Sequence, residues 1–182
     1  MTEMVEVVID SIRVSLMSQQ RIVILREVDN ERYLPIWIGT PEADSITLAL
    51  QEVEVSRPLT HDLLKNIFTS LDAQVVRVEV IALRDDTFYG NIVAELNGRT
   101  VNIDSRPSDA LALAVRTHVP IMVTRSVMDS AGIIPEEDLQ EEGEEVLDAP
   151  EVGSERLSVF EDFLENLGAD LDEEEDGGEE EE

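Results

Sequence analysis

The chain has no cysteine among its 182 residues. Without thiols it can form neither a disulfide framework nor a thiolate metal site, which fits a reducing compartment. It also lacks an apolar stretch of the roughly 20 residues that a membrane-spanning helix needs. The N-terminus has no basic region followed by an apolar run, so we expect no signal peptide. These absences predict a soluble, cytoplasmic protein with no membrane partner.

Positive charge is scarce, with 13 Lys and Arg residues against 42 Asp and Glu residues and a net charge of −29. The imbalance lies mostly in residues 129–182, which hold 24 acidic residues and one basic residue, Arg156, for a net charge of −23. Residues 1–128 carry a net charge of −6. A protein that binds polyanions through its overall field has an excess of Lys and Arg. The composition excludes that class, so a nucleic-acid site here must be a local cluster of arginines.

The body of the chain predicts seven strands and three helices. Runs rich in β-branched residues predict strands, and apolar residues at helical spacing predict helices. Pro41 and Pro107 indicate helix starts, with Thr40 as the expected cap of the first helix and Thr60 as the cap of the second. Asn97-Gly98 is a strong hairpin signal. The expected strands are 5–14, 21–26, 33–38, 75–83, 88–96, 100–104 and 120–124, and the expected helices are 41–50, 63–71 and 107–117.

The order strand, strand, strand, Pro-started helix occurs at residues 5–50 and again at 73–117. We therefore expect an α+β fold of duplicated β-β-β-α units with a mainly antiparallel sheet. The predicted domains are a body at 1–128, an acidic linker at 129–153, an amphipathic helix at 154–168 and a disordered acidic tail at 169–182. Pro35 cannot donate to a ladder, which favours an edge strand.

The stretch Ile103–Ala110 carries two carboxylates, two hydroxyls and a guanidinium at the turn from a strand into an apolar helix. Such a density of polar groups favours a functional site at this turn. The alternative is a capped turn whose side chains satisfy backbone groups.

Four motifs in order resemble the bifunctional nuclease family over about residues 4–128. They are Leu34–Gly39, Arg57–Leu63, Asp85–Tyr89 and Ile103–Ala110. The resemblance implies a compact α+β domain that hydrolyses phosphodiester bonds in both RNA and DNA. The motif residues of the family fall on Arg57, His61, Asp62, Asp85, Asp104, Arg106, Ser108 and Asp109.

An enzyme that cleaves both nucleic acids most simply activates water, through a carboxylate base or a bound cation. Asp104 and Asp109 flank one turn and are the candidate ligands of a divalent cation, with Asp62 or Asp85 completing the shell. Oxygen ligands of this kind suit Mg²⁺ or Mn²⁺. These four aspartates are the carboxylates among our candidate catalytic residues.

Arg57 and Arg106 have planar guanidinium groups suited to phosphate, and with Ser108 they are the expected substrate-binding residues. His61 is a candidate general acid because its charge changes near neutral pH. The alternatives are a surface position for His61 and a helix-capping role for Asp62. We expect the polar turns around these residues to converge on one concave surface.

Trp37, Phe88 and Tyr89 could stack on bases, although aromatic residues in strands usually belong to the core. A second functional class is a non-catalytic interaction module whose acidic C-terminal region recruits partners. That region could also compete with nucleic acid for the site, or act only as a solubilising tail. We expect a homo-oligomer, first a dimer, because strand edges are commonly covered by pairing.

Overall fold

Seven strands of the described residues form a single sheet in a computed structural model of the chain. The structure describes residues 3–14 and 20–134, which fall in a compact unit at Met1–Glu137. The predicted linker beyond residue 134, the helix at 154–168 and the tail at 169–182 lie outside the described residues. The strands are β1 (Met4–Val14), β2 (Arg21–Glu27), β3 (Tyr33–Ile38), β4 (Ala73–Arg84), β5 (Thr87–Leu96), β6 (Arg99–Ser105) and β7 (Ile121–Thr124).

The strand order is β3-β2-β1-β7-β4-β5-β6. β7 pairs with β1 antiparallel and with β4 parallel, and the remaining neighbours are antiparallel. This arrangement confirms the α+β class and the mainly antiparallel sheet. β3 lies at an edge, where the missing N–H of Pro35 breaks no ladder bond on its open side.

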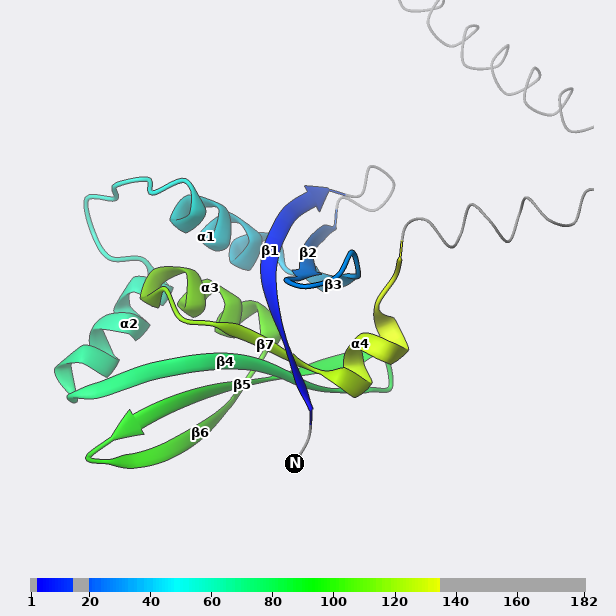
Figure 1. The fold of residues 1–182 in the computed structure, drawn as a ribbon. Coiled ribbons are helices and arrows are strands. Elements are labelled where there is room, and N and C mark those ends of the chain that lie inside the picture. The colour runs from blue at the N-terminus through cyan, green and yellow to red at the C-terminus, as the bar shows by residue number, and fades with distance from the viewer. Residues whose placement is uncertain (1–2, 15–19, 135–182) are drawn as a thin grey trace, which may run out of the picture. The chain divides into compact units, whose positions relative to one another are not determined.

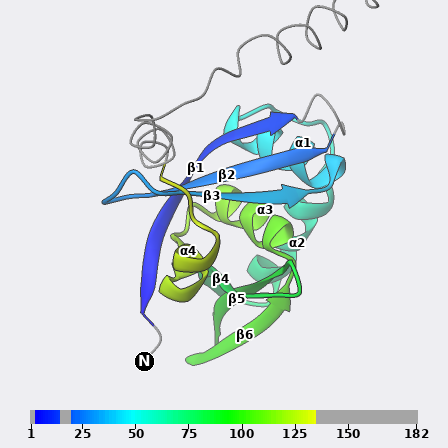
Figure 2. The same cartoon turned by 90° about the vertical axis from the view of Figure 1, so that its right-hand side faces the viewer.

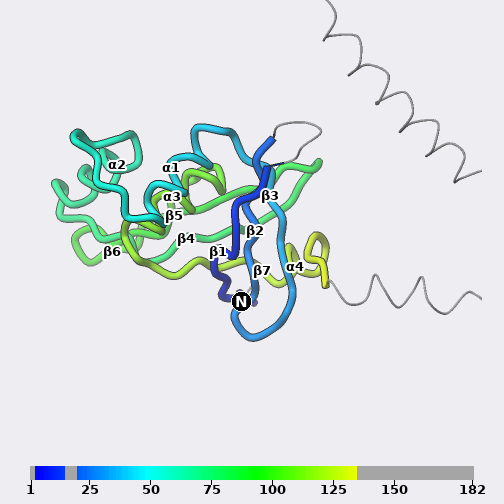
Figure 3. Tube along the Cα trace, turned by 90° about the horizontal axis from the view of Figure 1, so that it is seen from above, coloured from blue at the N-terminus to red at the C-terminus, as the bar shows by residue number. Residues whose placement is uncertain are grey.

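The helices of this part of the chain are α1 (Thr40–Leu50), α2 (Thr60–Ser70), α3 (Pro107–Thr117) and α4 (Arg125–Ala131). Three strands precede α1 and three strands precede α3, so the order β-β-β-α occurs twice. An origin by duplication remains a prediction. Within the described residues, Figure 3 shows α2 and α4 on opposite sides, with α1 and α3 close to α2.

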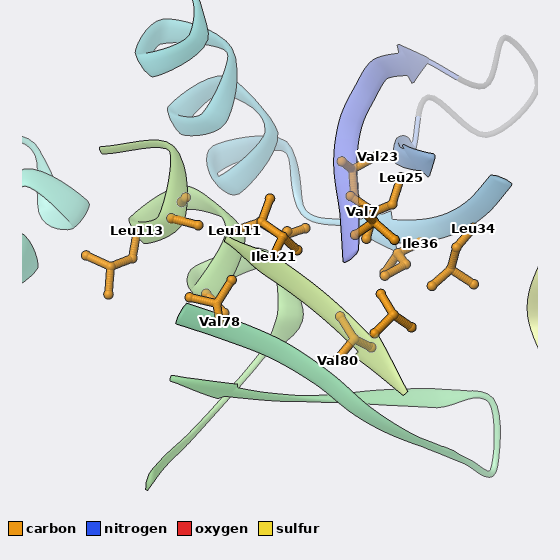
Figure 4. Packing of buried hydrophobic residues seen from close by; sticks show 14 of the residues in the cluster. Val7, Val23, Leu25, Leu34, Ile36, Val78, Val80, Leu111, Leu113 and Ile121 are labelled. Atoms are coloured by element: carbon orange, nitrogen blue, oxygen red, sulfur yellow. The ribbon is translucent and has the colours of Figure 1, made fainter. Parts of the chain in front are cut away.

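The core surrounds α3, which is apolar on nearly every side. In Figures 1 and 2, α3 lies between the β1-β2-β3 half of the sheet and the β4-β5-β6 half. Leu111 and Leu113 are fully buried, and they share the interior with Val78 of β4 and Leu25 of β2 (Figure 4). Burying side chains of this size stabilises the fold by about 1.5–3 kcal/mol each. The start of α3 is therefore fixed by the core behind it.

The expected caps of the first two helices are wrong. Gly39 and Leu59 occupy the cap positions, and Thr40 and Thr60 are the first helical residues. In α2 the Leu59 N–H donates to Asp62 Oδ2 at 2.8 Å, so a carboxylate three residues into the helix replaces the expected threonine hydroxyl. Within the described ranges, no helix is long and apolar enough to cross a membrane.

Candidate active site

The N-terminal parts of α1, α2 and α3 bring five polar side chains together. Glu42 and Ser45 come from α1, His61 from α2, and Arg106 and Asp109 from the start of α3. Each helix begins with residues that favour a helix N-terminus, so its first turn is well defined before any packing occurs. Packing of the three helices on one another then places these side chains in contact.

His61 connects α1 with α3. Its Nδ1 lies 2.9 Å from Ser45 Oγ, and its Nε2 lies 3.2 Å from Asp109 Oδ1. An ionised carboxylate only accepts, so Nε2–H donates to Asp109 and, in the neutral ring, Nδ1 accepts from the Ser45 hydroxyl. His61 is 8% exposed, so the expectation of a surface histidine is wrong. Tertiary partners on two other helices hold the ring in the interior.

Arg106 donates two hydrogen bonds to Asp109. Nε donates to Oδ2 at 2.7 Å and Nη2 donates to Oδ1 at 3.0 Å, and Nη2 also lies 2.6 Å from Glu42 Oε1. A bidentate pair of this kind fixes both position and orientation. The Arg106 side chain is still 65% exposed, so much of the guanidinium faces solvent.

Charge at the site is set by these contacts. Burial alone would raise the pKa of Asp109, but hydrogen bonds from Arg106 and His61 outweigh it and leave that pKa below its usual value. Asp109 and Glu42 in turn raise the pKa of Arg106. At neutral pH the cluster therefore holds a carboxylate beside the imidazole and a permanent cation at the surface.

Two open grooves meet at Arg106. The first, which we call the His61 groove, has a volume of about 570 Å³ and is lined by Ser45, Pro58, Thr60, His61, Arg106 and Asp109 among others. The second, the Trp37 groove, has a volume of about 560 Å³ and is lined by residues that include Trp37, Thr40, Asp86, Phe88, Arg106 and Ser108. The turns after Arg57 and after Asp85 thus both lie beside Arg106, as the expectation of convergence requires.

Gly90 lets β5 pack against the turn that carries Arg106. A Cβ at this position would lie 2.9 Å from Pro107 N and 2.9 Å from Ser105 O, both backbone atoms. Such a contact is too short for any side chain, so only glycine permits this approach. The close packing of β5 thus fixes the backbone of the turn that carries Arg106.

The structure brings three of the predicted site residues, His61, Arg106 and Asp109, into direct contact. Ser108 lies next to them in the chain and lines the Trp37 groove. Asp62 accepts instead from Arg116 Nε, 2.6 Å from its Oδ1, and caps α2.

The other three predicted residues are exposed. Asp85 occupies the left-handed turn between β4 and β5, with φ 48°. Asp104 and Arg57 form no ion pair with any residue in 3–14 or 20–134. Their roles as a catalytic or metal-binding carboxylate and as a phosphate ligand remain predictions.

A divalent-cation site does not fit the side chains that the structure describes. Within that part of the chain, no group of three or more His, Cys, Asp or Glu residues could hold a metal ion. Asp109 already accepts from Arg106 with both oxygens, and Asp104 is exposed. The expected Mg²⁺ or Mn²⁺ remains a prediction that these contacts do not support.

Sequence reasoning missed Glu42 and Ser45. Glu42 had a signal, because it is an acidic residue in the first turn of a helix that starts with a proline, as Asp109 is in α3. Both carboxylates occupy the third helical position and both bind Arg106. Ser45 had no signal, because only the packing of α2 against α1 brings its hydroxyl to His61.

Comparison with known proteins identifies related chains. Residues 23–136 match a family described as the bifunctional nuclease domain. An uncharacterized protein of Mycobacterium tuberculosis is 36% identical over 165 residues, covering 91% of this chain and 96% of the relative. Bifunctional nuclease 2 of Oryza sativa subsp. japonica is 29% identical over 118 residues, covering 63% of this chain and 36% of that protein. Bifunctional nuclease 1 of Arabidopsis thaliana is 26% identical over 103 residues, covering 55% and 32%.

Proposed function

Because this chain belongs to the bifunctional nuclease domain family, we propose that it is a nuclease that hydrolyses phosphodiester bonds in RNA and DNA. The observation that carries the proposal is the contact of His61 with Asp109, beside the exposed guanidinium of Arg106 at the junction of two grooves. These groups supply a proton acceptor and a phosphate ligand within one site.

Hydrolysis requires removal of a proton from water and stabilisation of charge on the phosphoryl oxygens. In the proposed reaction, Ser45 gives its proton to His61 Nδ1 and takes one from the attacking water, whose oxygen bonds to phosphorus. Asp109 accepts from Nε2–H and stabilises the imidazolium. The imidazolium then returns its Nδ1 proton through the Ser45 hydroxyl to the leaving oxygen, as the bond between that oxygen and phosphorus breaks.

Arg106 binds the phosphate in this scheme through the part of its guanidinium that faces solvent. Its bonds to Asp109 and Glu42 hold the group still, so little conformational freedom is lost on binding. Arg57, exposed next to Pro58 of the His61 groove, is a second proposed phosphate ligand. Asp104 and Asp85 are proposed as outer carboxylates of the site.

The test is a nuclease assay on single-stranded RNA and DNA with and without added Mg²⁺ or Mn²⁺. His61→Gln should lower the turnover rate by about 10²- to 10⁴-fold because it removes the proton acceptor. Arg99→Lys, an exposed change on the edge strand β6, is the matched control and should leave the rate unchanged. Wild-type activity in His61→Gln would contradict the role of His61, and an inactive wild type under all metal conditions would contradict the nuclease function.

The charge balance at the site supports a second candidate, a non-catalytic interaction module. The two negative charges of Glu42 and Asp109 exceed the single positive charge of Arg106, to which both residues bind. Such a site would favour a ligand with its own positive charge over a polyanion. In that case the protein would bind a basic partner and show no turnover of RNA or DNA in the same assay.

A further inference from the structure

We propose that the Trp37 groove binds an unpaired nucleotide, with its base on Trp37 and its phosphate at the starts of α1 and α3. The site would make single-stranded nucleic acid the favoured substrate. The inference rests on the proposed nuclease for its biological role, whereas the binding itself is measured without turnover. Three independent features of the groove support it.

The first feature is the exposure of Trp37. This side chain is 56% exposed on the edge strand β3, although a tryptophan in a strand is expected to be buried. Phe88, the second residue of β5, is half-buried and lines the same groove. An exposed aromatic face beside a second ring offers a platform on which any base can stack.

The second feature is Ser108, which is only 6% exposed and lines the groove. Its hydroxyl has no hydrogen-bond partner within residues 3–14 and 20–134. The residue is nearly buried, but its hydroxyl oxygen still opens onto the groove, because the only fully enclosed side-chain oxygen without a partner among the described residues is Ser105 Oγ. The place of Ser108 in the groove makes a ligand oxygen a suitable acceptor or donor for its hydroxyl.

The third feature is that two helices begin at this groove. Thr40 is the first residue of α1, and Ser108 lies in the first turn of α3. The early N–H groups of a helix have no partner inside the helix, and its dipole favours an anion there. Each first turn contains a proline without an N–H, so the donors that remain are the N–H groups of Thr40 and Glu42 in α1 and of Ser108 and Asp109 in α3.

Arg106 joins this groove to the reaction site. It lines both the Trp37 groove and the His61 groove. A nucleotide with its base on Trp37 therefore places a neighbouring phosphate beside His61 and Asp109. Bases in a duplex are stacked on one another, so only an unpaired or displaced base can reach Trp37.

Trp37 is the single tryptophan of the chain, so its fluorescence reports on this groove alone. We would titrate the full-length protein with a single-stranded DNA octamer, the same octamer without bases, and a duplex of equal length, all with phosphorothioate linkages in EDTA. The proposal expects saturable quenching by the octamer, with at least tenfold weaker binding of the duplex and of the strand without bases.

Variants measured by anisotropy of a labelled octamer test each contact. Trp37→Leu should weaken binding by about tenfold, in line with the loss of one stacked base. Ser108→Ala should weaken it by about threefold through the loss of one hydroxyl contact. Tyr89→Leu is the matched control, because Tyr89 is also exposed but packs under Arg84, with the guanidinium carbon 5.3 Å from the ring centroid. Circular dichroism should show that all three variants fold.

The outcomes separate this inference from the nuclease function. Quenching and tenfold loss in Trp37→Leu without hydrolysis would support the subsite and contradict the nuclease. Hydrolysis with unchanged octamer binding by Trp37→Leu would overturn the subsite and leave the nuclease in place. Equal binding of duplex and single strand would also overturn the proposal.

Discussion

Asp62 and His61 are neighbours in the first turn of α2, yet their side chains bind different partners. His61 links Ser45 to Asp109, whereas Asp62 binds the buried guanidinium of Arg116 and caps the helix. Arg116 also donates to two backbone carbonyls, so its charge is surrounded by acceptors. Asp62 therefore has a structural role that its position in the sequence does not distinguish from a catalytic one.

Asp62→Asn should lower the free energy of unfolding by about 1–2 kcal/mol at pH 7, because it leaves a buried guanidinium without its counter-ion. Burial alone would raise the pKa of Asp62. Hydrogen bonds from Arg116 and Leu59 have the opposite effect and outweigh burial, so the pKa lies below its usual 3.8. The stabilisation is thus present above pH 3.8 and is lost as the pH falls through the lower pKa of the folded state.

Urea denaturation of wild type and Asp62→Asn at pH 7 and pH 2.5 measures this dependence. The difference between the two proteins should shrink at the lower pH. Asp29→Asn, at an exposed position in the turn between β2 and β3, should have no effect at either pH. A constant difference at both pH values would show that the Asp62 carboxylate is not the source of the effect.

The motifs pointed to residues that meet in the structure, although their catalytic and binding roles remain predictions. His61, Arg106 and Asp109 were all candidates, and the structure joins them. Trp37 was expected in the core and is exposed instead, because it alternates with the buried Leu34 and Ile36 and so lies on the other face of β3. Burial of this kind depends on which elements pack nearby, and sequence spacing does not encode that.

At the scale of elements, the turn between β6 and α3 positions the site. Gly90→Ala would place a methyl group 2.9 Å from backbone atoms of this turn, so β5 or the turn must shift. We expect a loss of about 1–3 kcal/mol in unfolding free energy. Because the shift moves Arg106 relative to Asp109, nuclease activity should fall at least tenfold at a temperature where the variant is folded.

Gly98→Ala is the matched control for this change. Gly98 lies in the β5–β6 hairpin with φ 72°, where alanine is strained, but a Cβ there meets no atom within 4 Å. This variant should lose about 1 kcal/mol of stability and keep its activity. Equal loss of activity in both variants would show that general destabilisation, and not the position of Arg106, is responsible.

Local signals were sufficient for most elements. Pro107 opens α3 and Asn97-Gly98 closes the β5–β6 hairpin, as expected. α4 was not predicted, although Thr124 stands at its N-cap and Gly132 follows it, because seven residues are too few to show a helical period and the helix depends on burial of Val127 and Met128. A short helix held by tertiary contacts cannot be recognised from its own sequence.

At the scale of the whole molecule, the sequence predicts the fold class, but it does not predict which strands pair or which helices pack together. The parallel pairing of β7 with β4 joins segments about 40 residues apart, and neither strand carries a signal for the other. The same packing brings the starts of three helices together. The site is therefore a property of the tertiary arrangement, although each of its helices could be predicted alone.

The unequal distribution of charge predicts that the acidic C-terminal region competes with nucleic acid for the site. Residues 129–182 carry a net charge of −23, and a tethered polyanion competes with a nucleic acid for the same cations. Truncation after residue 137, the end of the compact unit, should tighten binding of the phosphorothioate octamer by about three- to tenfold at 20 mM salt. The gain should shrink at 200 mM salt as ions screen the charges. Truncation after residue 169 removes ten of the acidic residues and should give an intermediate gain. Equal affinities of all three proteins across the salt series would exclude competition and leave solubility as the role of the acidic region.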